Sequence, residues 1–395
     1  MTRPVSIETV GVWDTVSAIG LPFDMLLKTF IYRFFHFKFR DHELRDAVKS
    51  GMHALAIDDE RRTFHPALWK EDRAGIEQVW FAGVHSNVGG GYPKQEMSHV
   101  ALEWMISKYK WDGIKGIVFE PEFEDEVRRN ANVRGKLYDS RAGAAAYYRF
   151  APRDIDLLCR ENDIKTVKIH QSVFERIQSA TDGYNPGSIP VDHPIEVVGD
   201  PGSKATEYQI RAEETRSKRK EIVARAVPWI HRRKALHLLF VLMTMLTAAA
   251  FAQFFILRPD ASEALKACNC VVGLGGWWFY LVPSIVGLLI LVTLFCLKRP
   301  GRKIICFSAL VLVAAFTFTD VGLPNPVWDF GTRISGLLGF LLPDIVAAAL
   351  EYFIDNYPVQ AVAVILAYFI FWDLNSRFRR RSDEIYEQAC RTLRI

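Results

Sequence analysis

The sequence predicts an α/β domain followed by an all-α transmembrane region. Three observations lead to this fold class: short apolar runs typical of strands, amphipathic segments with helical spacing, and a long second half with few charges. Hydrophobic residues make up 50% and charged residues 24% of the 395 residues, and both fractions fit one chain only if they are segregated. Residues 1–234 are rich in charge, whereas most of residues 235–372 are not.

Two predicted strands each end at a residue that can take part in proton transfer. The run VSIETVGVW at residues 5–13 leads to Asp14, and the run VWFAGV at residues 79–84 leads to His85. Open parallel sheets place functional groups at the carboxyl ends of their strands. The alternatives are that Asp14 caps a helix beginning near Val16 and that His85 merely ends a strand.

Three glycines follow His85 closely and are predicted to shape its loop. They can adopt positive φ and let other groups approach the imidazole ring, and they are Gly89, Gly90 and Gly91. Histidine titrates near neutral pH, so it can take up a proton and return it. The pattern favours a base presented by a loop.

The other segments of the first half predict helices and loops. Helical spacing predicts helices over Leu44 to Ile57 and over Ser98 to Tyr109, with Ser98 as the N-cap. The cluster from Asp58 to Arg62 is interpreted as an ion-pair network that fixes a loop. Residues 111–200 are expected to form loops and short helices, and residues 211–234 a basic helix or linker.

Four apolar segments predict membrane-spanning helices. The first contains 22 residues, roughly 33 Å of helix at 1.5 Å per residue, and the four are Leu236 to Leu257, Val271 to Leu297, Ile304 to Thr319 and Val359 to Trp372. Basic clusters precede the first segment, lie between the second and third, and follow the fourth. The positive-inside rule then predicts a multi-pass protein of the inner (cytoplasmic) membrane, with the first domain and the C-terminus cytoplasmic.

Charge and cysteine spacing exclude two classes of function. The net charge of +4 is modest and the basic residues lie beside apolar segments, so no nucleic-acid partner is expected. The six cysteines have no zinc-type spacing, so no metal site is predicted. A histidine base preceded by a carboxylate instead suggests the last two members of a Ser–Asp–His triad, in the chain order of α/β-hydrolases.

Several motifs together resemble a known family. They are GVWDTVSAIG at 11–20, HALAIDDERRTFHPALW at 53–69, VWFAGVHSNVGGGY at 79–92, and DSRAG and YYR near residues 140 and 148. Over roughly residues 7–197 the chain resembles the catalytic domain of the type VI secretion lipase (phospholipase) effectors, once a domain of unknown function. The resemblance implies an α/β-hydrolase that cleaves lipid esters with no metal or organic cofactor, in which Asp14 matches the triad acid and His85 the triad base.

The sequence departs from this family at two places. Asn87 stands where the family usually has Asp. The family's serine lies in a Gly-x-Ser-x-Gly turn upstream of the acid, but Ser6 has no flanking glycines, Ser140 follows both partners, and Ser86 adjoins His85. We therefore expect no nucleophile in this chain and an incomplete α/β-hydrolase-like domain. A mis-assigned start, a broken gene, or a separate polypeptide that supplies the N-terminal half of the domain would each explain this.

These interpretations predict both the domain organisation and the function. The expected parts are a partial hydrolase domain at 1–205, a basic linker at 206–234, a transmembrane region at 235–372 and a cytoplasmic basic tail at 373–395. The expected function is that of a membrane-anchored relative of phospholipases, inactive alone and with membrane lipid as a partner. The alternative is a non-catalytic membrane protein whose degenerate hydrolase domain binds a partner or a lipid.

Overall fold

The structure is a computed structural model that describes residues 6–16, 44, 47–71, 74–111, 117–200, 202–256 and 358–395. The chain divides into two compact units. One comprises Met1–Lys234 together with Arg379–Ile395, and the other comprises Ala235–Phe378.

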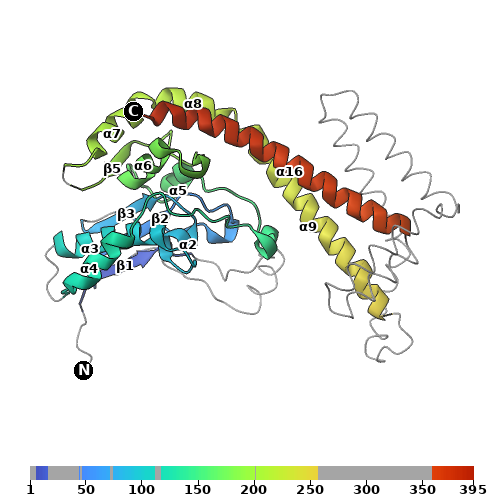
Figure 1. The fold of residues 1–395 in the computed structure, drawn as a ribbon, viewed down its shortest axis with the longest axis horizontal. Helices are drawn as coiled ribbons and strands as arrows, with labels where there is room; N and C mark the ends of the chain where they lie inside the picture. Colours follow the sequence, from blue (N-terminus) through green and yellow to red (C-terminus); the bar gives the residue numbers. More distant parts are fainter. Residues whose placement is uncertain are drawn as a thin grey trace. The chain divides into compact units, whose positions relative to one another are not determined.

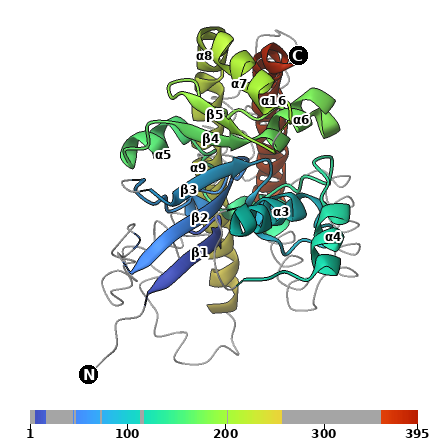
Figure 2. The ribbon, with the colours of Figure 1, turned by 90° about the vertical axis from the view of Figure 1, so that its left-hand side faces the viewer.

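A parallel five-stranded sheet forms the centre of the first unit, and it confirms the α/β class (Figures 1 and 2). Its strands lie side by side in chain order: β1 (Ile7–Trp13), β2 (Val48–Ala56), β3 (Ile76–Phe81), β4 (Val167–His170) and β5 (Ile195–Val198). Trp13 pairs with Ala54, and Ala56 pairs with Phe81. Because the strands are parallel, their carboxyl ends meet at one edge of the sheet.

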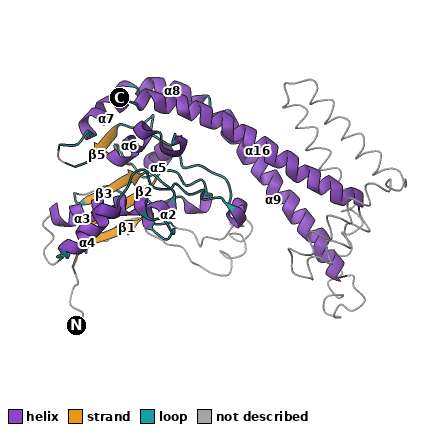
Figure 3. Cartoon of the chain, in the orientation of Figure 1, coloured by secondary structure: helices purple, strands orange, loops and turns teal. Residues whose placement is uncertain are grey.

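Helices lie between and after these strands (Figure 3). They are α2 (His85–Gly89), α3 (Glu96–Trp111), α4 (Pro121–Asn130), α5 (Ile155–Glu161), α6 (Gln171–Ser179), α7 (Ala205–Glu214), α8 (Arg216–Ala224), α9 (Val227–Ile256) and α16 (Pro358–Leu393). Three short 3-10 turns complete the described elements: η1 (Arg62–Phe64), η2 (Gly143–Tyr147) and η3 (Thr181–Gly183).

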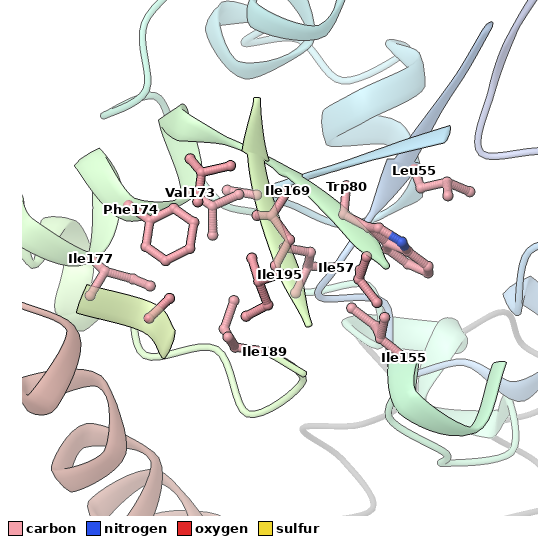
Figure 4. Close-up of a cluster of buried hydrophobic side chains, with 14 of the residues drawn as sticks. Leu55, Ile57, Trp80, Ile155, Ile169, Val173, Phe174, Ile177, Ile189 and Ile195 are labelled. Atoms are coloured by element: carbon pink, nitrogen blue, oxygen red, sulfur yellow. The ribbon is translucent and has the colours of Figure 1, made fainter. Parts of the chain in front are cut away.

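Successive strand residues send their side chains to opposite faces of the sheet, so each face carries its own hydrophobic cluster. Leu55 and Trp80 belong to the larger cluster, which Figure 4 shows with residues of α5 and α6. Residues of α7 and of the end of α16 belong to it as well. Ala54 and Phe81 belong to the second cluster, with residues of α2 and α3. Helices on both faces thus bury the sheet and fix the edge where the strands end.

Two predicted elements are confirmed and others need correction. The strand before Asp14 is β1, and the helix after the glycines is α3. However, α3 begins at Glu96, two residues before Ser98, so Ser98 is not its N-cap. Ser98 Oγ instead donates to the Gln95 carbonyl oxygen at 2.9 Å. The helix predicted over Leu44 to Ile57 is wrong, because Val48–Ala56 forms the strand β2. From Gly51 to Ala56 β2 is buried at every position, so its apolar residues do not alternate with polar ones and can imitate helical spacing.

The predicted membrane location is contradicted. Among the residues that the structure describes, no helix has both the length and the apolar character needed to cross a membrane. The segments 271–297 and 304–319 lie outside those residues. The other two fall in α9 and α16, whose aromatic rings of Phe240 and Phe371 stack with centroids 4.5 Å apart. The uncharged run of α16 ends at Asp373 after 15 residues, roughly 22 Å, which is shorter than a hydrocarbon core.

Candidate active site

Asp14 lies at the carboxyl end of β1 in a left-handed backbone conformation, with φ of 45°. Its side chain is fully buried, and its Oδ1 accepts a hydrogen bond from the Ala56 backbone N–H at 2.9 Å. The carboxylate therefore extends across the end of the neighbouring strand β2. Val16 forms an isolated bridge with Pro66, and residues 17–43, in which the alternative places a helix capped by Asp14, lie outside the described residues.

His85 follows β3 and is the first residue of α2. Its Nδ1 lies 2.7 Å from Asp14 Oδ2, and 28% of its side chain is exposed. An ionised carboxylate can only accept, so Nδ1 carries the proton and donates it to Asp14. Nε2 then has a free lone pair and can accept a proton from another group.

Arg153 is the second partner of Asp14, and the sequence did not reveal it. One guanidinium nitrogen lies 2.7 Å from Oδ1 and the other 2.7 Å from Oδ2, and neither side chain is exposed. The same guanidinium also donates to the backbone carbonyl oxygens of Ala56 and Phe64. Burial alone would raise the pKa of Asp14, but Arg153 and the hydrogen bond from His85 hold that pKa well below its usual range.

His53 on β2 supports the turn that follows Asp14. Its Nε2 accepts from the Thr15 backbone N–H at 3.2 Å, so the proton is on Nδ1, 3.3 Å from Gln78 Oε1. Burial lowers the pKa of His53 to about 4, because a charged ring would be poorly solvated there. His53 is therefore neutral near pH 7 and acts as a fixed support.

Two carboxylates after β2 hold the loop that presents His85. Asp58 Oδ2 accepts from the Gly83 backbone N–H at 2.7 Å, and Asp59 Oδ2 accepts from the His85 backbone N–H at 3.2 Å. Asp59 is fully buried and is also paired with Arg61 at 2.7 Å. Of the predicted ion-pair network over residues 58–62, the described residues show the Asp59–Arg61 pair, whereas Glu60 pairs with Arg233 outside the cluster at 3.5 Å. The contacts of Asp58 and Asp59 fix the backbone on both sides of Val84.

Asp58 also accepts from the Tyr184 hydroxyl at 2.9 Å and lines a cavity of about 300 Å³. Burial raises the pKa of Asp58 to about 6, although the hydrogen bonds from Gly83 and Tyr184 oppose this change. Asp58 therefore changes charge close to neutral pH.

The three glycines after His85 differ in their backbone conformation. Gly90 and Gly91 have φ of 86° and 105°, the left-handed region that favours glycine. Gly89 is the last residue of α2 and is not among the residues with positive φ. Gly83, on the other side of His85, has φ of 119°, and a Cβ there would lie 2.5 Å from the Asn87 Cβ.

Asn87 is buried and uses both ends of its amide. Its Nδ2 donates to the Lys136 carbonyl oxygen at 3.0 Å, and its Oδ1 accepts from the Tyr138 backbone N–H at 3.3 Å. An ionised Asp at this position could accept but could not donate to Lys136. Asn87 therefore joins α2 to the segment at 136–138, which gives a physical reason for this residue.

The described residues supply no hydroxyl partner for His85 Nε2. Ser140 is buried and lines the cavity beside Asp58. Ser86 adjoins His85 in α2, and Ser6 precedes β1. In the part of the chain that the structure describes, no group of three or more His, Cys, Asp and Glu side chains could hold a metal ion.

A family model matches the part of the chain that contains Asp14 and His85. The model is that of the type VI secretion (T6SS) phospholipase effector Tle1-like catalytic domain, and it matches residues 1–108. This segment is Tle1-like. No curated protein and no solved structure matches the chain.

The Tle1-like segment contains β1, β2, β3, α2 and most of α3. It therefore includes the Asp14–His85 pair and both carboxylates that hold the loop, but not Arg153. The family resemblance is confirmed over residues 1–108, whereas the motifs near residues 140 and 148 lie beyond the match. The catalytic roles of Asp14 and His85 remain predictions.

Proposed function

We propose that Asp14 and His85 are the acid and base of an acyl-ester hydrolase that acts on lipid substrates. The observation that carries this proposal is the 2.7 Å contact between a fully buried carboxylate and the Nδ1 of a partly exposed histidine at the carboxyl edge of a parallel sheet. The Tle1-like match over residues 1–108 supports the phospholipid class of substrate.

The geometry suits one reaction sequence. A serine hydroxyl adds to the ester carbonyl carbon while its proton passes to His85 Nε2, and Asp14 stabilises the imidazolium that forms. The tetrahedral intermediate collapses, the alcohol leaves with the proton from His85, and an acyl-serine remains. Water then attacks the acyl-serine, again with His85 as base, and releases the fatty acid and the free serine.

The serine has to come from a segment other than the described residues, because none of these gives His85 Nε2 a hydroxyl partner. We assign it to a separate polypeptide that pairs with β1. Among the described strands β1 is at the end of the sheet, and its residue Ile7 is 43% exposed. A parallel strand paired there would end beside Asp14, so a Gly-x-Ser-x-Gly turn after it could approach His85.

Co-expression tests this function. The chain is produced with a polypeptide that carries the Gly-x-Ser-x-Gly strand and helix of a Tle1-like domain, and release of fatty acid from a panel of phospholipids and acylglycerols is measured. We expect hydrolysis by the complex and a loss of roughly a thousandfold or more in His85→Ala. The matched control is His99→Ala, which should retain full activity, because His99 lies on α3 and its side chain contacts the backbone: Nδ1–H donates to the Gln95 carbonyl oxygen at 2.8 Å.

Two outcomes would decide against the proposal. Equal hydrolysis by the wild-type and His85→Ala complexes would remove His85 from the mechanism. A stable complex that hydrolyses none of the lipids would favour the non-catalytic alternative, in which the domain binds a partner.

A further inference from the structure

Arg153 occupies a place in the site that neither the family match nor the sequence motifs assign. It lies between the bridge formed by Phe150 and the start of α5, outside residues 1–108. It nevertheless contacts the Asp14 carboxylate through both terminal nitrogens, at 2.7 Å each.

The contacts of Arg153 fix the orientation of Asp14. Each carboxylate oxygen has one guanidinium nitrogen and one further donor: the Ala56 N–H on Oδ1 and the His85 Nδ1–H on Oδ2. A bidentate pair of this kind defines the plane of the carboxylate as well as its position. The backbone of Arg153 is itself held, because the Ser188 hydroxyl donates to its carbonyl oxygen at 2.7 Å.

The charges make Arg153 more than a structural support. The Asp14 carboxylate and the guanidinium sum to zero, so protonation of His85 adds a net positive charge to a buried site. Without Arg153, the full negative charge of Asp14 would act on the protonated His85 ring. Arg153 therefore limits how strongly Asp14 stabilises the protonated histidine.

We infer that Arg153 is a positioning residue that orients Asp14 toward His85 and offsets its charge, and so sets the lower pH limit of the reaction. The role rests on the proposed function of Asp14 and His85. Other charged or titratable groups that act on Arg153 or are affected by it are Asp58, Asp59, His53 and His65. The two histidines have pKa values lowered by burial to about 4, whereas Asp58 titrates near 6 and has to be controlled.

Two substitutions separate orientation from charge. Arg153→Lys keeps the positive charge but cannot span both oxygens, whereas Arg153→Gln loses the charge and the bidentate contact. In the complemented enzyme we expect both variants to lower kcat by roughly tenfold to a hundredfold with little change in KM. Only Arg153→Gln should move the acidic limb of the kcat/KM profile, to higher pH by about one unit. Both are compared in an Asp58→Asn background, which removes the titration of Asp58.

A second measurement needs no activity and uses the full chain alone. The proton between His85 Nδ1 and Asp14 should give a downfield NMR resonance, assigned by its absence in His85→Ala. We expect it to be lost or strongly shifted in Arg153→Gln and kept in Arg160→Gln. Arg160 is the matched control because its side chain is 62% exposed and pairs only loosely with Asp192, at 3.3 Å.

The outcomes distinguish this role from the proposed function. An unchanged resonance and an unmoved acidic limb in folded Arg153→Gln would overturn the role of Arg153, even if His85→Ala is inactive. If Arg153→Gln does not fold, a shift of the acidic limb in Arg153→Lys would overturn the role, because this variant keeps the positive charge. Absence of hydrolysis in every complex would refute the proposed function, while the resonance would still decide whether Arg153 controls the Asp14–His85 pair.

Discussion

At the scale of single residues, Asp58 links the site to stability. Its pKa is about 6 in the fold and about 3.8 in the unfolded chain, so the folded state holds this proton more strongly. The ionised form is therefore penalised: the penalty is absent below about pH 4 and complete above about pH 6. Asp58→Asn, which imitates the protonated form, should raise the free energy of unfolding at pH 8 by up to about 3 kcal/mol.

Urea unfolding at pH 5 and pH 8 measures this effect. The stabilisation by Asp58→Asn should be larger at pH 8. Asp125→Asn is the control, because the Asp125 side chain is 60% exposed, and it should change stability by less than about 0.5 kcal/mol at both values. An equal effect of Asp58→Asn at pH 5 and pH 8 would show that its ionisation does not matter to the fold.

Of the site residues, Asp14 and His85 could be found from the sequence, whereas Arg153 could not. Asp14 and His85 each follow a strand-like run directly, so a local pattern places both at the carboxyl edge of the sheet. Arg153 lies 139 residues from Asp14, and its neighbours in the sequence form no motif. It is one of 49 basic residues, and only the tertiary fold distinguishes it from the others.

At the scale of elements, the turn from β3 to α2 depends on Gly83. Its φ is 119°, and an added Cβ would lie 2.5 Å from the Asn87 Cβ, which the helix fixes. Gly83→Ala should therefore lower the free energy of unfolding by about 2–4 kcal/mol, through both backbone strain and the steric clash. It should also weaken the contact of His85 with Asp14, because the two hydrogen bonds between Gly83 and Asp58 hold the loop that presents His85.

Gly90→Ala is the matched control for this substitution. Gly90 also has a positive φ, 86°, but an added Cβ would meet no atom within 4 Å. Chemical denaturation should show only the cost of this backbone conformation, in which ψ is 178°, about 1–3 kcal/mol. Equal losses in the two variants would exclude the clash with Asn87 as the cause.

Elements were harder to predict where both faces are buried. The segment from Met52 to Ile57 is buried at every position, so its apolar residues carry no period that separates a strand from a helix. β4 and β5 have only four residues each and were not predicted within the loops expected over residues 111–200. In contrast, α3 was predicted because one of its faces is exposed and its period is visible.

At the scale of the whole molecule, the first unit is completed by residues that lie far away in the sequence. Arg379–Ile395 belongs to the same unit as Met1–Lys234, although residues 235–378 form the other unit. Cys390 and Leu393 are part of the larger hydrophobic cluster, and Gln178 Nε2 donates to the Leu393 carbonyl oxygen at 3.2 Å. No local sequence pattern could indicate that residues 379–395 belong to the first unit, because the contacts join segments more than 200 residues apart.

Leu393→Ala tests whether this segment is part of the folding unit. Leu393 is 2% exposed, so its truncation should leave a cavity and lower the free energy of unfolding by about 2–4 kcal/mol. Ile395→Ala, two residues further along, removes a side chain that is 57% exposed and should cost less than about 0.5 kcal/mol. The measurement is urea unfolding followed by tryptophan fluorescence, because Trp80 belongs to the same cluster as Leu393. If both variants unfold at the wild-type urea concentration, residues 379–395 do not stabilise the sheet, and the first unit ends at residue 234.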